Sequence, residues 1–473
     1  MSLLRRLLVL LFVLVMGVPT FAQDVAATAL DGYWHGALKV SGVELRLMFE
    51  FKKDDKGVWG GVLTSIDQGN AKIPVGSVEW DGTNLKFEIP AIGGSFDGRL
   101  DAGKISGQWI QAGNKLPLVL EHRDEAFTLN RPQEPKPPFP YRSEDLSYPN
   151  PDAKGVTLAG TLTLPEGKLS AAVVLVSGSG PQDRNESLMG HKPFLVLADH
   201  LTRKGIAVLR FDDRGVGGST GDPASATTDD FVTDALAGVA YLKTRAELAH
   251  TPIGIVGHSE GGLIAPLAAV QSDSVAFIVL LAGPAVTGEE ILYLQSELIL
   301  KASGVDDAYL ERSREMQQRH FAILKEEPDP AKAETKLRAL YAELTEVEKQ
   351  ISGLTDAALD AQIAMSNSPW FRRFLTYDPR ETLVKLTCPV LALFGEHDLQ
   401  VPPSQSLPEM KAILEKAPSK NVTVREFPGL NHLFQHSTTG APSEYGTIEE
   451  TFAPEALDAI GGWILERSEV AGI

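Results

Sequence analysis

The stretch that most constrains this chain is Ile253–Val270, which reads IGIVGHSEGGLIAPLAAV. Its first four residues are apolar and predict a buried strand, while the small and apolar residues after Gly261 predict a helix. Between them stands the pattern Gly-x-Ser-x-Gly, centred on Ser259. A strand that turns straight into a helix leaves no space for side chains two positions either side of the serine, which accounts for Gly257 and Gly261. The pattern therefore predicts a strained turn, a nucleophile elbow, that lifts the Ser259 hydroxyl above a parallel sheet.

A serine hydroxyl is a weak nucleophile at neutral pH and needs a base that is itself oriented by an acid. Behind such an elbow, the acid follows a late strand of the sheet and the histidine follows the last strand. The apolar segment Val390–Phe394 is followed by Asp398, and the segment Val422–Phe427 is followed by His432. Position and order together predict that Ser259, Asp398 and His432 form a catalytic triad.

Other residues of the same chemistry are less well placed. Glu396 and His397 leave the same strand as the predicted acid but precede it, where reach to the histidine is less favourable. A second Gly-x-Ser-x-Gly surrounds Ser219, but no apolar strand abuts it and Asp-Pro follows in place of a helix, so it predicts a loop. The remaining histidines, including His258 inside the elbow, have no placement that matches a catalytic base.

Acyl transfer passes through an oxyanion that backbone N–H groups stabilise. One donor follows the nucleophile, which makes it the amide of Glu260. The second belongs to the loop after an earlier strand, here Ser177–Gly180 directly after Ala171–Val176, and the amide of Ser179 is our candidate. This scheme requires neither a metal ion nor an organic cofactor.

Residues 1–22 have the pattern of a secretory signal peptide. Two arginines precede the unbroken apolar run Leu7–Met16, and Thr-Phe-Ala, which ends at Ala22, places small residues where a signal peptidase reads them. Ten apolar residues are few for a bilayer span, so we expect cleavage rather than an uncleaved anchor. The mature protein is then periplasmic or extracellular, without stable membrane insertion. The single cysteine, Cys388, cannot form an internal disulfide and is expected to be a small buried core residue.

At 473 residues the chain predicts two or three structural units. Residues 23–128 read as an all-β accessory domain, a small antiparallel barrel or sandwich, with hairpin turns at Gly57, Gly82 and Gly103. Four of the six tryptophans fall in this domain, where they either pack its core or form a ligand-binding surface. The expected strands are Trp34–Val40, Glu44–Lys52, Val58–Ser65, Val75–Glu79, Asn84–Glu88, Gly94–Leu100, Lys104–Ile110 and Leu116–Glu121.

A proline-rich linker, residues 129–142, marks the main domain boundary. From 143 to 473 strand-like and helical segments alternate, which predicts an α/β domain with a mostly parallel sheet and helices on both faces. The expected strands are Val156–Leu164, Ala171–Val176, Ile206–Phe211, Ile253–Val256, Val275–Ala282, Pro389–Phe394 and Val422–Phe427, with flanking helices over Pro193–Lys204, Asp229–Leu248 and Pro454–Glu466.

Residues 287–385 interrupt this alternation with helical segments, and we expect them to form a cap over the site or, alternatively, an extra helical layer. Three aromatic residues, Trp370, Phe371 and Phe374, close the insertion and either line the pocket or fix the cap in place. The expected helices are Glu289–Ala302, Ala308–Lys325, Lys332–Ile351 and Asp356–Ala364.

Residues 143–473 resemble the serine-hydrolase branch of the α/β-hydrolase superfamily, and in particular bacterial esterases and serine aminopeptidases of family S33. The resemblance implies an α/β-hydrolase fold with a Ser-Asp-His triad. The chain departs from the usual pattern in one respect. After the strand Ala171–Val176, where the family usually has His-Gly, this chain has Ser177-Gly178. The identity of the second oxyanion donor therefore stays open. The N-terminal β domain resembles an accessory domain that precedes such hydrolases. The segments that carry the resemblance are Ser177–Asn185, Phe211–Ser219, Gly257–Gly262, Ser368–Pro379, Gly395–Pro402 and Asn431–His432.

The sequence thus predicts a serine hydrolase that cleaves small-molecule carboxylic esters. A peptidase with the same triad is the first alternative, since an acid of the cap such as Glu289, Glu290 or Glu297 could hold a substrate amino group. The second alternative is a secreted binding protein that uses its β domain. A net charge of −18 without a basic cluster argues against a nucleic-acid partner, and the oligomeric state is left open.

Overall fold

The computed structural model describes residues 30–40, 43–66, 71–111, 114–127, 130–345, 348–349 and 354–471. The predicted signal peptide, residues 1–22, lies outside the described residues. Within these ranges, none of the helices combines the length and the apolar character needed to cross a membrane. The chain forms two compact units, Met1–Asn130 with Ser443–Glu449, and Arg131–Pro442 with Glu450–Ile473.

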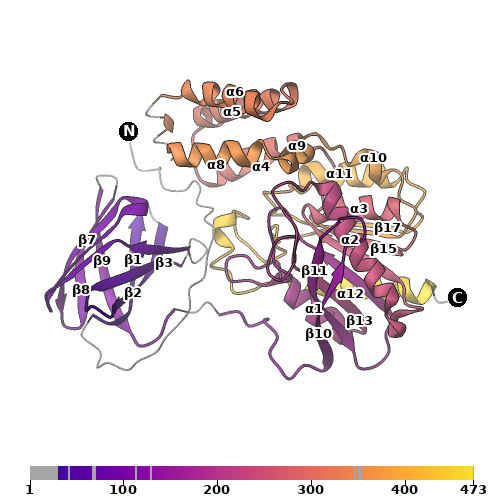
Figure 1. Cartoon of the computed structure of the whole chain (residues 1–473), viewed down its shortest axis with the longest axis horizontal. Helices are drawn as coiled ribbons and strands as arrows, with labels where there is room; N and C mark the ends of the chain where they lie inside the picture. The colour runs from indigo at the N-terminus through magenta and orange to yellow at the C-terminus, as the bar shows by residue number, and fades with distance from the viewer. Residues whose placement is uncertain are drawn as a thin grey trace. The chain divides into compact units, whose positions relative to one another are not determined.

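The first unit contains one antiparallel sheet in the order β4-β3-β2-β1-β9-β8-β7-β6-β5. The first and last strands of this order are consecutive in the chain, and β3 also contacts β5, so the sheet closes almost completely into a barrel (Figure 1). The strands are β1 (Gly32–Val40), β2 (Val43–Lys53), β3 (Trp59–Ser65), β4 (Ala71–Val75), β5 (Ser77–Trp80), β6 (Asn84–Ile89), β7 (Gly94–Asp101), β8 (Lys104–Gln111) and β9 (Asn114–Arg123).

One strand of this unit differs from the prediction. The expected strand Val75–Glu79 is divided between β4 and β5, and Gly76 stands at the break. A Cβ on Gly76 would lie 2.8 Å from the ring of Pro90, so the backbone bends there against the proline. The sequence of residues 75–79 looks like that of a single strand. The break at Gly76 follows from its close approach to Pro90, which the sequence does not reveal.

Aromatic side chains fill the interior of the barrel. Trp34 and Trp109 are almost fully buried, while Trp59 and Trp80 are half-buried and pack against the same core. The tryptophans therefore follow the core-packing alternative. The other large aromatic residues of this core are Phe49, Phe51, Phe87 and Phe96.

The second unit is built on an eight-stranded sheet in the order β10-β11-β13-β12-β14-β15-β16-β17. The pairs β10–β11 and β11–β13 are antiparallel, and all later pairs are parallel. Apolar β-branched and leucine side chains dominate the central strands, which are buried on both faces. The strands are β10 (Tyr141–Pro149), β11 (Thr157–Pro165), β12 (Ala171–Val176), β13 (Ile206–Phe211), β14 (Ile253–His258), β15 (Phe277–Leu281), β16 (Val390–Gly395) and β17 (Val422–Phe427).

Strand β10 was not predicted. Its sequence, YRSEDLSYP, is polar, because an edge strand pairs on one side only and leaves much of its surface exposed. It begins at Tyr141, inside the segment expected to be linker.

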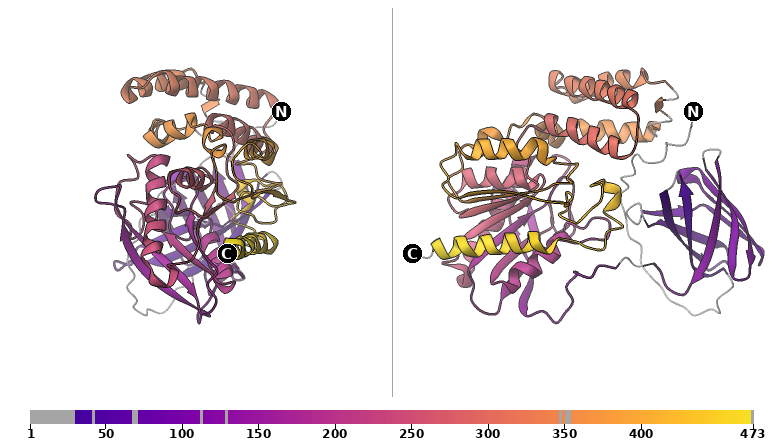
Figure 2. Two further views of the ribbon diagram at one scale, coloured as in Figure 1. Left: turned by 90° about the vertical axis from the view of Figure 1, so that its right-hand side faces the viewer. Right: turned by 180° about the vertical axis from the view of Figure 1, so that it is seen from behind.

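Helices cover the sheet in two groups: α1 packs beside α12, and α2 packs beside α3 (Figures 1 and 2). The predicted helix Asp229–Leu248 is too long, since α2 ends at Thr244 and a separate 3-10 turn covers Ala246–Leu248. The helices are α1 (Pro193–Arg203), α2 (Thr228–Thr244), α3 (Gly261–Gln271), α10 (Arg380–Leu383), α11 (Pro403–Leu414) and α12 (Pro454–Ala471).

The insertion forms a helical layer with a small core of its own at one end of the second unit (Figure 1). Phe321, Leu337 and Phe371 are buried in that core. The predicted helix Lys332–Ile351 is shorter in the structure, where α6 ends at Ala342, and part of the remainder lies outside the described residues. The helices of the insertion, called the cap helices from here on, are α4 (Gly288–Ala302), α5 (Asp307–Glu326), α6 (Pro330–Ala342), α8 (Asp356–Ser366) and α9 (Pro369–Thr376). Their position does not decide between a cap over the site and an extra helical layer.

Candidate active site

Ser259 lies at the sharp turn between β14 and α3, in a left-handed backbone conformation with φ of +53°. A residue other than glycine is strained there, and such strain gathers at functional turns. A Cβ on Gly257 would stand 2.0 Å from the carbonyl oxygen of Gly261, and a Cβ on Gly261 would stand 2.2 Å from that of Val176. No side chain fits at either position, so the two glycines permit the close approach of helix and sheet that exposes the serine.

Asp398 and His432 meet at the same edge of the sheet. His432 Nδ1 lies 2.8 Å from Asp398 Oδ2, and both side chains are buried. The other carboxylate oxygen, Oδ1, accepts the backbone N–H groups of Gln400 at 2.7 Å and Val401 at 2.8 Å, which fixes the carboxylate toward the imidazole. Among the hydrogen bonds of the described residues, none joins Ser259 Oγ to His432 in this conformation, and such contacts often tighten only when substrate binds.

The two neighbours of Asp398 have other partners. Glu396 Oε2 accepts the N–H of Gly429 at 2.8 Å. His397 Nδ1 lies 2.9 Å from the carbonyl oxygen of Ser437. Each of these contacts shapes the loop after β17, and neither directs its side chain to the imidazole of His432.

Ser219, the serine of the second Gly-x-Ser-x-Gly, is buried in a loop. Its Oγ donates to the carbonyl of Asp212 at 2.7 Å and accepts the N–H of Ala159 at 2.8 Å. The hydroxyl thus ties the loop after β13 to β11, and it has a structural role.

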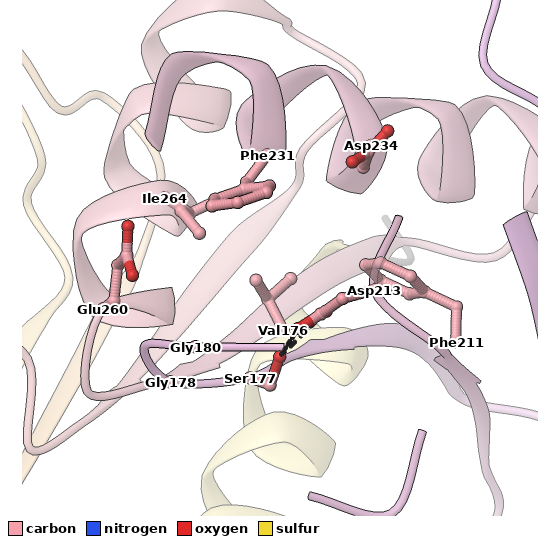
Figure 3. Close-up of a pocket in the computed structure, with 10 residues that line it drawn as sticks. All are labelled: Val176, Ser177, Gly178, Gly180, Phe211, Asp213, Phe231, Asp234, Glu260 and Ile264. Carbon is pink, nitrogen blue, oxygen red and sulfur yellow. Dashed lines mark hydrogen bonds between the residues drawn. The ribbon is translucent and has the colours of Figure 1, made fainter. Parts of the chain in front are cut away.

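The loop after β12, which carries Ser177, Gly178 and Gly180 in Figure 3, approaches the nucleophile. A Cβ on Gly178 would lie 3.1 Å from Cβ of Ser259. The N–H of Gly178 donates to Glu186 Oε1 at 2.8 Å, which commits that amide and leaves the next one, of Ser179, as the candidate for the second oxyanion donor. Glu260 stands at the N-terminus of α3, where backbone N–H groups lack partners within the helix, and its side chain makes no capping hydrogen bond. Its amide is the first candidate donor.

A small pocket lies behind this loop and contains carboxyl groups (Figure 3). Its cavity of about 20 Å³ has room for a single water-sized group, so it is too small to accept an acyl chain. Burial, opposed by hydrogen bonds from Gln182 and Ser177 and reinforced by the charges of Glu260 and Glu186, raises the pKa of Asp213 to about 8. Burial also raises the pKa of Glu260. The residues that line the pocket are Val176, Ser177, Gly178, Gly180, Phe211, Asp213, Phe231, Asp234, Glu260 and Ile264.

Two residues of the site escaped the sequence analysis. His258, dismissed as a candidate base, has its ring centre 4.8 Å from that of His432, and its Nδ1 lies 2.8 Å from Glu186 Oε1. Glu186 belongs to none of the predicted strands or helices and comes 72 residues earlier in the chain. No local pattern connects them, although the segment that ends at Asn185 already carried the family resemblance. In the described part of the chain, no group of three or more His, Cys, Asp or Glu side chains is arranged to hold a metal ion.

A mostly parallel sheet with a strained serine turn after β14 and a buried carboxylate–imidazole pair after its last two strands defines an α/β-hydrolase. The family described as "Serine aminopeptidase, S33" matches residues 188–351, a range that contains Ser259 and ends before Asp398. Esterase EstD of Thermotoga maritima is 29% identical over 320 residues, a match that covers 65% of this chain and 66% of EstD. The chain therefore has the α/β-hydrolase fold, and it is similar to bacterial esterases and to serine aminopeptidases of family S33. Its match to EstD spans just under two thirds of that relative's length.

Solved structures of similar proteins include an esterase and a peptidase. The Pyrococcus furiosus esterase Pf2001 is 15% identical with a TM-score of 0.43, and the match covers 73% of this chain and 100% of that one. A proline iminopeptidase of Mycobacterium smegmatis is 17% identical with a TM-score of 0.41, covering 69% of this chain and 100% of that one.

Proposed function

We propose that this protein hydrolyses carboxylic esters through an acyl-enzyme on Ser259. The observation that carries the proposal is the buried Asp398–His432 pair, at 2.8 Å, on the same sheet edge as the strained turn of Ser259. This arrangement supports a triad in which Ser259 is the nucleophile, His432 the base and Asp398 the acid that orients the base.

The first half of the reaction forms the acyl-enzyme. Ser259 Oγ attacks the ester carbonyl while His432 Nε2 takes the hydroxyl proton. The tetrahedral oxyanion is stabilised by the amides of Glu260 and Ser179, and His432 then returns the proton to the departing alcohol. Asp398 holds Nδ1 of the ring protonated, so that Nε2 is the atom free to move the proton.

The second half releases the acid. A water molecule gives a proton to His432 Nε2 and attacks the acyl carbonyl, and the second oxyanion collapses with expulsion of Ser259 Oγ, which recovers its proton from His432. The same three side chains and two amides serve both halves, and the scheme needs no cofactor.

The cap favours an ester over a peptide with a free amino terminus. An aminopeptidase needs an acid available to the substrate amine, but the three candidate acids of α4 have local partners. Glu289 pairs with Lys325 at 2.7 Å, Glu297 pairs with Lys301 at 2.5 Å, and Glu290 caps α4 through Thr287. Parallel assays on p-nitrophenyl acyl esters and aminoacyl p-nitroanilides separate the two activities, and we expect turnover of the esters.

Labelling with a fluorophosphonate tests the nucleophile. Wild-type protein and Ser219→Ala should label equally, whereas Ser259→Ala should not label, and the matched Ser219 variant controls for loss of a serine from a Gly-x-Ser-x-Gly turn. Labelling of Ser259→Ala at the wild-type rate would refute the assignment.

We also propose that the protein is exported and that cleavage near Ala22 releases it. The support is the arginine pair, apolar run and small residues of residues 1–22. Sequencing of the amino terminus of protein recovered from the periplasm or medium tests this, and a retained Met1 on that protein would contradict it.

A further inference from the structure

His258, the residue before the nucleophile, bridges two parts of the site. Its Nδ1 lies 2.8 Å from Glu186 Oε1, and its Nε2 lies 2.9 Å from the backbone carbonyl oxygen of His432. The same Oε1 of Glu186 accepts the N–H of Gly178 at 2.8 Å. One carboxylate and one imidazole thus connect the loop beside the oxyanion, the nucleophile turn and the loop of the catalytic histidine.

The contacts define the protonation of this bridge. Both ring nitrogens of His258 face oxygen acceptors, so both must donate and the ring is an imidazolium. Glu186 supplies the opposite charge, and both side chains are buried, which strengthens their attraction. A ring that donates from both nitrogens has no lone pair for the Ser259 hydroxyl, so His258 is not a second base.

The backbone around Glu186 is itself held in an unfavourable state. Its φ is +53°, a region that non-glycine residues rarely occupy, and the residue as a whole is only 4% exposed. Strain of this kind persists only where the surroundings over-determine the position. Here the carboxylate has two donors, from Gly178 and His258, on one oxygen.

We propose that Glu186 and His258 form a positioning pair that fixes the relative placement of the nucleophile turn, the oxyanion loop and His432. The proposal rests on the function proposed above. It assigns the pair no proton transfer. The pair holds His432 by its backbone carbonyl and Gly178 by its amide, while the Asp398 carboxylate orients the His432 ring through Nδ1.

Placement of this kind bears on the rate of the chemical steps more than on substrate binding. A displacement of about 1 Å in a reacting group can lower turnover about a hundredfold. The hydrogen bonds of the pair join Gly178 and His432, and in the described residues none of them reaches a cap helix. The KM, which depends on binding of the acyl group, should therefore change little.

Two substitutions at His258 dissect the bridge. An asparagine amide stands where Nδ1 stands and can donate to Glu186, while a glutamine amide stands where Nε2 stands and can donate to the His432 carbonyl. His258→Asn therefore loses the contact with His432, and His258→Gln loses the contact with Glu186. Glu186→Gln keeps both positions but removes the negative charge of the carboxylate.

The experiment measures kcat and KM on a p-nitrophenyl ester, with kcat normalised to active sites titrated by a phosphonate so that unfolded protein does not count. We expect kcat to fall about tenfold to a hundredfold in Glu186→Gln and His258→Asn, with KM changed less than about threefold. The kcat of the double variant, Glu186→Gln with His258→Asn, should fall no further than that of the worse single variant, because the same bridge is broken in all three proteins. His258→Gln carries the same test if Glu186→Gln does not fold.

His436→Gln is the matched control. This histidine also pairs with a glutamate, Glu450, at 2.9 Å, but it is largely exposed and should keep the wild-type kcat. Wild-type kcat per titrated site in the Glu186 and His258 variants would overturn the inference. A wild-type protein that turns over no ester and takes up no phosphonate would instead overturn the proposed function, so the two failures are distinguishable.

Discussion

Trp370 of the cap donates its indole N–H to Oε1 of Glu260, the residue that follows Ser259, at 2.8 Å. The same oxygen accepts the hydroxyl of Thr228 from the first turn of α2 at 2.7 Å. The Trp370 ring also stacks on Phe374, with ring centres 5.6 Å apart. Of the two roles considered for these aromatic residues, fixing the cap is the one that their contacts support, and the fixing point is the residue whose amide is the candidate oxyanion donor.

Trp370→Phe tests this connection. Phenylalanine keeps an aromatic ring against Phe374 but removes the N–H, which leaves the buried Glu260 carboxyl short of a donor. Such a loss typically costs about 1–3 kcal/mol of stability. We expect a lower Tm and a lower kcat, measured by thermal unfolding and ester turnover. Trp80→Phe, at a half-buried site in the other unit, is the matched control, and a Trp370 variant equal to wild type in both measurements would argue against the connection.

Asp398→Asn should abolish most of the turnover while the protein stays folded. The amide can still occupy the space of the carboxylate, but a side-chain NH₂ facing Nδ1 favours the wrong tautomer of His432. A loss of about ten-thousandfold in kcat is expected from this change in a triad. Glu396→Gln is the control, because its side chain can still accept the Gly429 amide. Equal losses in the two variants would disprove the assignment of the acid.

Gly257→Ala tests the elbow itself. The new methyl group would stand 2.0 Å from a backbone oxygen of Gly261, and the conflict can be relieved only by separating helix from strand. We expect a destabilisation of about 1–3 kcal/mol or more in chemical denaturation, with loss of phosphonate labelling. Gly462→Ala in α12 meets no atom within 4 Å and should raise stability by about 0.5–1 kcal/mol. A Gly257 variant as stable and as reactive as wild type would contradict the close packing.

How far the sequence predicts this site depends on whether a feature is local. The turn at Ser259 could be predicted because its glycines stand within two residues of it. The position of Asp398 could be predicted because it follows the apolar strand β16, and that of His432 because it follows β17, the last strand of the sheet. The Glu186–His258 contact and the Trp370–Glu260 contact span 72 and 110 residues, and no local pattern records such pairs.

The fold shows the same division. All seven predicted strands of the second unit agree with the structure to within two residues at each end, namely Val156–Leu164, Ala171–Val176, Ile206–Phe211, Ile253–Val256, Val275–Ala282, Pro389–Phe394 and Val422–Phe427. Most of them are apolar runs, which give a strong local signal. The polar edge strand β10 lacked that signal. Cys388 lies next to a buried strand, as predicted, but it precedes β16 and is only half-buried against the core. Burial depends on what packs over a strand end, which the strand's own sequence does not specify.

The buried acid Asp213 makes stability depend on pH. Burial first, with the charges of Glu260 and Glu186, raises its pKa to about 8 from an ordinary value of 3.8. The folded protein therefore holds a proton that the unfolded chain releases, and the free energy of unfolding falls as pH rises between these two values. Asp213→Asn keeps a neutral acceptor for the Ser177 hydroxyl and the Gln182 amide, which both contact the carboxylate. We expect the variant to gain stability over wild type progressively from about pH 4 to about pH 8, followed by urea denaturation at each pH. A constant difference across that range would show that Asp213 is ionised in the folded protein as it is in the unfolded chain.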